Sequence, residues 1–178
     1  QQMYGPLASH GDIKLDNVMT RPSGRGGFRS CLIDYGHCKS AMFRSSRSRL
    51  AYWSPVERYE CGLRSDMWSV GILAICLVSS SLRTYLQSGG LAAHKTVAVV
   101  SELSGVPAPT NQHLPERQVR IARGGARLRD AHKAVLSRVC EKARRRLRRC
   151  KELYEVVLRC LSWSPSHRPD PDLVSSAL

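Results

Sequence analysis

Residues 10–17 read HGDIKLDN, and residues 32–36 read LIDYG. Together these stretches gather several charged or polar side chains into 27 consecutive positions: Asp12, Asp16, Asp34, Lys14 and Asn17. Phosphoryl transfer requires such a set, because a carboxylate orients the attacking hydroxyl, a cation neutralises the moving phosphate, and oxygen ligands hold magnesium on the nucleotide. The two stretches therefore point to a single site that the rest of the chain holds in place.

A β-hairpin is expected between the two stretches. Residues 18–19 and 28–33 carry most of the apolar side chains of this region, and the intervening residues 21–27 read RPSGRGG. Proline and glycine between two apolar runs are typical of a turn. A hairpin here would bring Asn17 and Asp34 close together, which is the geometry that a shared cation needs.

The length and composition favour one globular unit. A chain of 178 residues can bury one sizeable core, and no obvious linker divides it. We therefore expect one domain, or one lobe of a larger protein. The hydrophobic content of 42% is ordinary for such a protein, whereas the formal net charge of +14 is high.

Neither a membrane span nor a secreted protein is indicated. The longest apolar run, residues 67–78, is interrupted by Ser69 and Gly71 and is shorter than the roughly 18 residues of a membrane span. It is predicted to be a buried helix. The N-terminus lacks the pattern of a secretory signal, and the seven cysteines form no Cys-x-x-Cys pair. We expect reduced, mostly buried thiols and an intracellular protein, cytoplasmic or nuclear, without membrane contact.

A polar segment and a helix are expected after the second stretch. Residues 37–53 interleave basic residues with serines, which predicts a mobile surface segment, and residues 52–57 read YWSPVE. Ser65 and Asp66 are predicted to form a helix N-terminus, because both side chains accept hydrogen bonds from free amides of a first turn. The helix of residues 67–78 follows.

Further helices are predicted in the second half of the chain. Residues 91–103 are expected to form one helix, and apolar spacings of three and four predict a longer one over about 127–161. The chain then reads WSP at residues 163–165 and Arg-Pro at 168–169, before a short last helix near 171–178.

In this order, the motifs resemble the large C-terminal lobe of eukaryotic protein kinases. The matching parts are the catalytic loop HGDIKLDN, the metal-binding triplet DYG, the corner SPVE, the helix start SDMWSVGI and the closing Arg-Pro. Each motif alone is weak, and their shared order carries the resemblance. It implies an α+β, mainly α fold over residues 1–178, with a short hairpin at the catalytic loop, a central buried helix, residues 37–57 as the activation segment, and no small lobe.

The resemblance assigns roles to four side chains. Asp12 would be the base that orients the substrate hydroxyl, and Lys14 would neutralise the phosphoryl group as it moves. Asn17 and Asp34 would bind Mg²⁺ on ATP. From the residues alone, Asp12 and Asp34 are also read as cap residues, Asn17 as a turn residue and Lys14 as a solvated lysine. A lysine two positions after the aspartate resembles serine/threonine kinases, so a protein hydroxyl is the implied acceptor.

Three other residues have supporting roles in this resemblance. Asp66 would hold the backbone of the catalytic loop, and His10 would pack within that loop. Arg168 would pair with Glu57 of the SPVE corner, although more than 100 positions separate them.

Several positions depart from the family pattern. Gly11 replaces the arginine that receives an activation-loop phosphate, so control by phosphorylation of that loop is not expected. Tyr35 replaces phenylalanine and is expected to be mostly buried with a partner for its hydroxyl. The corner has Ser54 in place of alanine and the extra residue Val56. Some herpesvirus-type kinases also lack the arginine, so a viral origin is one expectation.

A basic segment occupies residues 117–151. It holds 14 of the 28 lysines and arginines, against two acids, Asp130 and Glu141. It is either a solvated helix face, a nuclear-import or nucleic-acid patch, or a docking face for an acidic partner. The absence of interleaved aromatic residues disfavours stacking on single strands.

Three functions compete: a serine/threonine protein kinase, a pseudokinase or scaffold, and a basic nucleic-acid-binding module. The retention of Asp12, Lys14, Asn17 and Asp34 together favours the kinase. No Gly-rich nucleotide loop precedes His10 in this sequence. Phosphate transfer from ATP with Mg²⁺ is therefore expected of a longer parent protein and not of these residues alone.

Overall fold

The computed structural model describes residues 9–24, 26–38, 63–110 and 116–171. The α-helices in these residues are α1 (Leu63–Val78), α2 (Ser80–Gln87), α3 (Ala92–Ser104), α4 (Glu116–Ala131), α5 (Lys133–Leu147) and α6 (Lys151–Cys160). The strands are β1 (Val18–Ser23) and β2 (Gly27–Leu32), and the 3₁₀ helices are η1 (Leu15–Asn17), η2 (Tyr35–His37) and η3 (Pro165–His167). The expected α+β, mainly α composition is confirmed.

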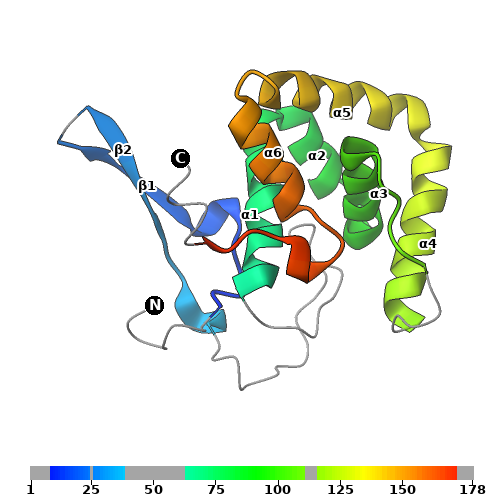
Figure 1. Ribbon diagram of the computed structural model, residues 1–178, viewed down its shortest axis with the longest axis horizontal. Helices are drawn as coiled ribbons and strands as arrows, with labels where there is room; N and C mark the ends of the chain where they lie inside the picture. Colours follow the sequence, from blue (N-terminus) through cyan, green and yellow to red (C-terminus); the bar gives the residue numbers. More distant parts are fainter. Residues whose placement is uncertain (1–8, 25, 39–62, 111–115, 172–178) are drawn as a thin grey trace.

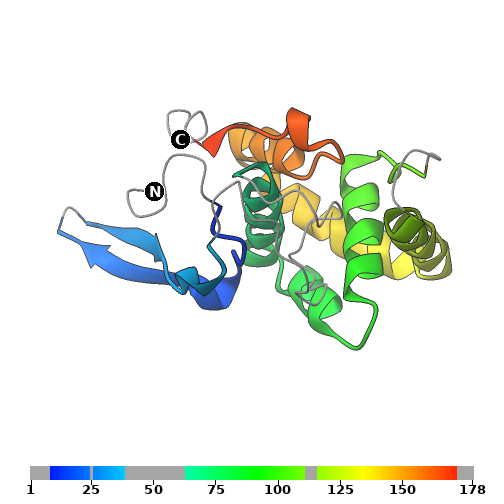
Figure 2. The same cartoon turned by 90° about the horizontal axis from the view of Figure 1, so that it is seen from below.

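The predicted hairpin is also confirmed. Strands β1 and β2 pair antiparallel with a register that runs from Val18 opposite Leu32 to Ser23 opposite Gly27. Gly26, at φ 78°, supplies the left-handed backbone that the turn requires. The hairpin projects away from the helical body in both views (Figure 1 and Figure 2), and most of its residues are exposed, Phe28 by 79%.

Helix α1 lies on the side of the helical body nearest the hairpin and packs against α6 (Figure 1). Its residues Trp68, Ile72 and Ile75 are completely buried, which confirms the prediction of a buried helix. Gly71 allows close packing, because a Cβ at that position would lie 2.9 Å from the side chain of Leu161. The predicted start of this helix at Ser65 and Asp66 is wrong. Helix α1 already includes Leu63, so Ser65 and Asp66 lie inside its first turns and do not cap it.

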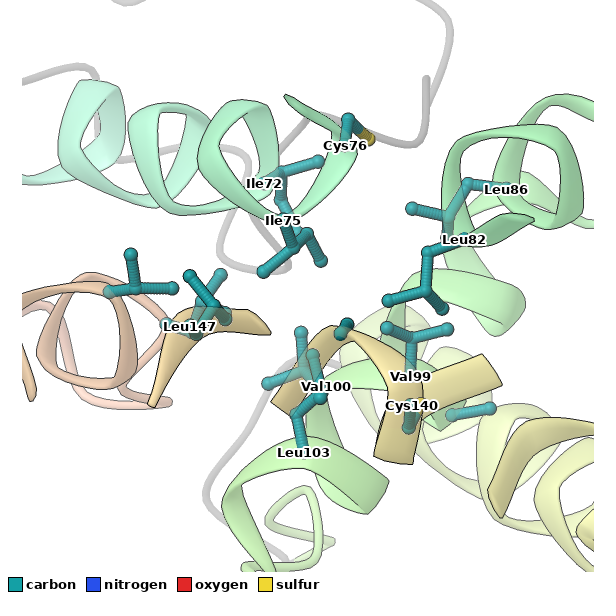
Figure 3. Packing of buried hydrophobic residues seen from close by; sticks show 14 of the residues in the cluster. Ile72, Ile75, Cys76, Leu82, Leu86, Val99, Val100, Leu103, Cys140 and Leu147 are labelled. Carbon is teal, nitrogen blue, oxygen red and sulfur yellow. The ribbon is translucent and has the colours of Figure 1, made fainter. Parts of the chain in front are cut away.

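The hydrophobic core is formed by one face from each of five helices (Figure 3). The labelled residues come from α1, α2, α3 and α5: Ile72, Ile75, Cys76, Leu82, Leu86, Val99, Val100, Leu103, Cys140 and Leu147. Helix α6 adds Val157, and Leu161 follows it. Burial of this apolar surface is the main stabilising term, since it scales with the area removed from water at roughly 25 cal/mol per Å².

The thiol prediction is confirmed in part. All six cysteines in the described residues are free, but only Cys76, Cys140 and Cys160 are buried, while Cys31 and Cys150 are exposed. Burial raises the pKa of the Cys76 and Cys160 thiols to about 11 and that of Cys140 to about 12. These three thiols therefore behave as small apolar groups of the core.

The single long helix predicted over 127–161 is wrong. The chain forms three helices there, with breaks at His132 and at residues 148–150. The apolar spacing that predicted this helix includes Val135, which is 52% exposed, whereas the buried residues of α5 begin with Leu136. The helix predicted over 91–103 is confirmed as α3, and most of the one predicted over 171–178 lies outside the described residues. Among the described helices, none has the length and apolarity of a membrane span.

Candidate active site

Helix α1 anchors the loop that carries the candidate site. The buried carboxylate of Asp66 accepts hydrogen bonds from the backbone nitrogens of His10, at 2.7 Å, and Gly11, at 3.0 Å. Burial raises the pKa of Asp66, and the two amide donors oppose this rise because they stabilise the charged form. The predicted role of Asp66 as the holder of the loop backbone is confirmed.

His10 connects this loop to the strand that returns from the hairpin. Its ring is buried, its Nε2 lies 3.0 Å from the carbonyl oxygen of Ile33, and its Nδ1 accepts from the amide of Asp12 at 3.4 Å. These contacts together indicate the tautomer with the proton on Nε2. The ring centroid of Tyr35 lies 4.9 Å away. His10 is therefore the packing residue that was predicted, and its link to Ile33 is a contact that sequence spacing did not indicate.

Three of the four predicted site residues are in direct contact. The Nζ of Lys14 lies 2.7 Å from Asp12 Oδ2, and Asn17 Nδ2 donates to the carbonyl oxygen of Asp12 at 2.9 Å and to its Oδ2 at 3.1 Å. The hydrogen bond to Asp12 raises the pKa of Lys14, against an opposing desolvation effect. The ammonium group therefore stays charged at neutral pH, as a cation that stabilises phosphate must be.

The fourth residue, Asp34, reaches the same region through the hairpin. The amide of Ile33 donates to the carbonyl oxygen of Asn17 at 3.0 Å, so the pairing of β1 and β2 extends to the residue before Asp34. The negative charge of Asp34 also contributes to the raised pKa of Lys14, as the charge of Asp16 does to a smaller extent. Asp34 is exposed and therefore accessible to a ligand.

The backbone around Asp34 differs from a regular strand. Asp34 has φ 63° and ψ 67°, and its side chain accepts from the amide of Gly36 at 3.4 Å. A left-handed conformation at a residue other than glycine costs about 1 kcal/mol and needs local support. The following Tyr35 is 49% exposed, so the expectation of a mostly buried ring is wrong.

The side chains present fit a magnesium-nucleotide site in their chemistry. Asp12 and Asp34 offer carboxylate oxygens and Asn17 an amide oxygen, which are hard ligands that Mg²⁺ accepts in small number when phosphates and water complete its shell. Within the described residues, no group of three or more His, Cys, Asp or Glu side chains is arranged to hold a metal on its own. A site of this kind therefore depends on ligands that the nucleotide supplies.

Arg168 is fully buried beside the same N-terminal end of α1 that carries Asp66. Its guanidinium donates to the carbonyl oxygens of Ser162, at 3.0 Å, and Arg64, at 3.1 Å, and lies 5.0 Å from the ring of Trp68. Trp163 packs on the same ring at 5.5 Å. Glu57, its predicted partner, lies outside the described residues, so that pair stays a prediction.

With this geometry in view, comparison with known proteins gives two relatives. A dual specificity tyrosine-phosphorylation-regulated kinase 2 of Drosophila melanogaster is 24% identical over 190 residues, which is 96% of this chain and 24% of that protein. A serine/threonine-protein kinase STE20 of Yarrowia lipolytica (strain CLIB 122 / E 150) is 34% identical over 85 residues, which is 44% of this chain and 7% of that protein. The chain is distantly similar to protein kinases.

The similarity is limited in extent. No family model matches the chain, and no solved structure matches it. The chain spans about a quarter of the fly kinase and a smaller share of the yeast one. Both relatives are cellular proteins, and the comparisons give no support to the expected viral origin.

Proposed function

We propose that this chain is the large-lobe portion of a serine/threonine protein kinase and that residues 10–34 carry its catalytic loop and metal-binding triplet. The observation that carries this proposal is the contact of Lys14 and Asn17 with one oxygen of Asp12, at 2.7 and 3.1 Å, on a loop whose backbone is held by Asp66. Residues 37–57 are then its activation segment. The resemblance to kinases and the two distant kinase relatives support the same reading.

In this proposal each side chain has a defined task. Asp12 accepts the hydrogen bond of the attacking serine or threonine hydroxyl of a protein substrate, and thereby orients its oxygen. Lys14 neutralises negative charge on the phosphoryl oxygens during transfer. Asn17 and Asp34 would hold the Mg²⁺ of bound ATP, which would supply the phosphoryl group and a metal charge that stabilises the phosphates.

The position of the Lys14 ammonium suits this task. It already forms an ion pair with Asp12, and Asp34 and Asp16 further favour its charged form. A phosphoryl group that enters beside Asp12 would therefore meet a cation that is already in place, and little reorganisation is needed at the moment of transfer. The exposed side of Asp34 leaves room for a magnesium ion with its water and phosphate ligands.

The experiment is a protein kinase assay of the longer parent protein with matched aspartate substitutions. Asp12→Asn is expected to lower kcat by about 10²–10⁴-fold, the range for loss of a positioned acid or base. Asp34→Asn removes a proposed magnesium ligand and is expected to lower kcat as well. Asp16→Asn removes a neighbouring, exposed carboxylate and is expected to keep most of the activity. Asp34→Asn is also expected to raise the magnesium concentration that half-saturates the reaction.

Two outcomes would contradict the proposal. If the parent protein binds ATP with magnesium but transfers no phosphate, a pseudokinase or scaffold role would replace it, and the change from the family arginine to Gly11 favours that alternative. If Asp12→Asn and Asp16→Asn behave alike in an active protein, the active site lies elsewhere. The 178 residues alone are expected to transfer no phosphate. The intracellular location stays a prediction.

A further inference from the structure

The basic segment of residues 117–151 does not spread its charge evenly around α4 and α5. On α4 the buried residues are Ile121, Ala122 and Gly125, and on α5 they are Leu136, Cys140, Ala143 and Leu147. Six exposed basic residues lie on the opposite faces of the same helices, at spacings of three or four along each helix: Arg120, Arg123, Arg127, Arg138, Lys142 and Arg145. We call these six residues the basic corner.

The charge of the basic corner is almost uncompensated. Among the described residues, one ion pair involves the basic corner. It joins Arg145 to Glu141, at 3.7 Å. Of the other acids nearby, Asp130 lies 3.5 Å from Arg129, Glu102 accepts from Ser137, and Glu116 lies one turn before Arg120 on α4. Side chains of like charge at spacings of three or four repel one another, so the row costs stability in the free protein. A ligand of opposite charge would offset that cost.

The two rows meet at an angle. Helix α5 crosses the top of the body and α4 descends along its side (Figure 1), and the view from below shows α5 lying across α4 (Figure 2). Each row faces away from the helices on which its own helix packs, so the basic corner is convex. A rigid duplex that lies along one row cannot also follow the other. A flexible chain can turn the corner and contact both.

A single-stranded nucleic acid is also disfavoured. Base stacking on aromatic side chains supplies much of the affinity of single-strand binders. Residues 116–147 contain no Phe, Tyr or Trp. Five of the six side chains are instead arginines, whose planar guanidinium groups form two parallel hydrogen bonds with a carboxylate.

We propose that the basic corner is a docking surface for a flexible protein segment rich in Asp and Glu. On α5, Arg138, Lys142 and Arg145 follow one another by one helical turn, about 5–6 Å, so alternate carboxylates of an extended acidic segment match their spacing. The segment continues onto α4 along Arg127, Arg123 and Arg120. This surface is separate from the Asp12 region, and the proposal does not depend on kinase activity.

The test is the binding of a fluorescent poly-glutamate peptide, measured by anisotropy at low and physiological salt. The double substitution Arg138→Glu with Lys142→Glu is expected to weaken binding by about tenfold or more, because each exchange removes an exposed attraction and adds a repulsion. Arg123→Glu with Arg127→Glu is expected to weaken it as well. Higher salt should reduce the affinity of the unmodified protein.

The matched control is Arg21→Glu with Arg29→Glu on the hairpin. These two exposed residues face each other in the strand register and lie on the other side of the body from α4, and their reversal changes the net charge by the same amount. The control is expected to bind the peptide about as well as the unmodified protein. Circular dichroism of each variant checks that its helices are intact.

Three results would overturn the proposal. Equal losses in the α5 variant and the hairpin control would mean that net charge alone attracts the peptide. If the α5 variant loses affinity for the peptide and the α4 variant does not, the partner does not extend from α5 onto α4. Tighter binding of duplex DNA or single-stranded RNA than of the peptide would assign the surface to nucleic acid.

Discussion

The carboxylate of Asp66 lies 2.7 Å from the backbone nitrogen of His10, although 56 positions separate the two residues. Through this contact helix α1 holds in place the loop that carries Asp12, Lys14 and Asn17. A buried carboxylate is costly unless donors surround it, and here the donors belong to the loop that it positions. The core of the helical body and the candidate site are therefore coupled through one side chain.

Removal of the Asp66 carboxylate is expected to destabilise the protein. Asp66→Ala leaves the buried amide of His10 without its acceptor, which should lower the free energy of unfolding by about 1–3 kcal/mol. Asp66→Asn keeps one oxygen acceptor, so its stability should lie between that of the unmodified protein and that of Asp66→Ala. Asp130→Ala, at an exposed site on α4, is the control and should change stability by less than about 0.5 kcal/mol. Urea unfolding measures all three, and equal effects of Asp66→Ala and Asp130→Ala would refute the coupling.

Gly11 is expected to be required for the backbone of the loop. Its φ of 77° lies in the left-handed region, so Gly11→Ala should cost about 1–2 kcal/mol of stability. Gly24 is the matched control in the hairpin turn, because its φ is not positive and a Cβ there would meet nothing within 4 Å. Thermal unfolding of the two alanine variants compares them. A Gly11→Ala variant as stable as Gly24→Ala would show that the loop adapts to a side chain.

The contact between α3 and α4 depends on a pair of glycines. A Cβ at Gly125 would lie 2.6 Å from the Cβ of Val97 and 3.1 Å from the carbonyl oxygen of His94, which are atoms that cannot move without the helix. Gly125→Ala should therefore destabilise the protein by about 1–3 kcal/mol. At Gly124 the three atoms nearest the added Cβ all belong to the ring of His94, the closest at 2.9 Å, and this ring can rotate.

Gly124→Ala is consequently the control for that prediction. Alanine improves helix propensity by about 1 kcal/mol over glycine, and this gain should offset much of the cost of moving the His94 ring. Denaturant unfolding of both variants is expected to give the larger loss for Gly125→Ala. The reverse order would mean that α4 shifts as a unit and that the ring, not the backbone, fixes the contact.

His94 is expected to make stability depend on pH. Burial and, to a smaller extent, the charge of Arg120 lower the pKa of His94 below its ordinary value of 6.5. The unfolded chain therefore takes up a proton at this residue at a higher pH than the folded protein does. The contribution of neutral His94 to stability is therefore complete above about pH 6.5. As pH falls from there towards the folded pKa of His94, the free energy of unfolding should decrease.

Urea unfolding at several pH values tests this dependence. The decrease below pH 6.5 is expected to be smaller in His94→Gln, which cannot take up the proton. Arg120→Gln should bring the pKa of His94 closer to its ordinary value and also flatten the profile. A His94→Gln profile with the same slope as that of the unmodified protein would assign the pH dependence to other groups.

The sequence predicted the local elements of the site correctly. The Pro- and Gly-rich turn between two apolar runs specified the hairpin, and the apolar run of residues 67–78 specified a buried helix, because both patterns depend on neighbours in sequence. The resemblance to kinases assigned Asp12, Lys14 and Asn17 to one site, and their position within one short loop agrees with the contacts among them. Such contacts need only the conformation of a few residues.

Only the tertiary structure decided what depends on partners distant in sequence. The local pattern at Ser65 and Asp66 predicted a helix cap, and only the resemblance to kinases assigned Asp66 to the loop. In the structure the Asp66 oxygens accept from the amides of His10 and Gly11, because the loop offers amides that must be satisfied. The periodicity of residues 127–161 predicted one helix, but the core residues of this range lie on two separate helices, Leu136–Leu147 on α5 and Val157 on α6, with breaks at His132 and after Leu147. The break at His132 sets the angle between the basic rows of α4 and α5. Local pattern sets the elements, and burial against the rest of the chain sets where they end and which side chains they leave outside.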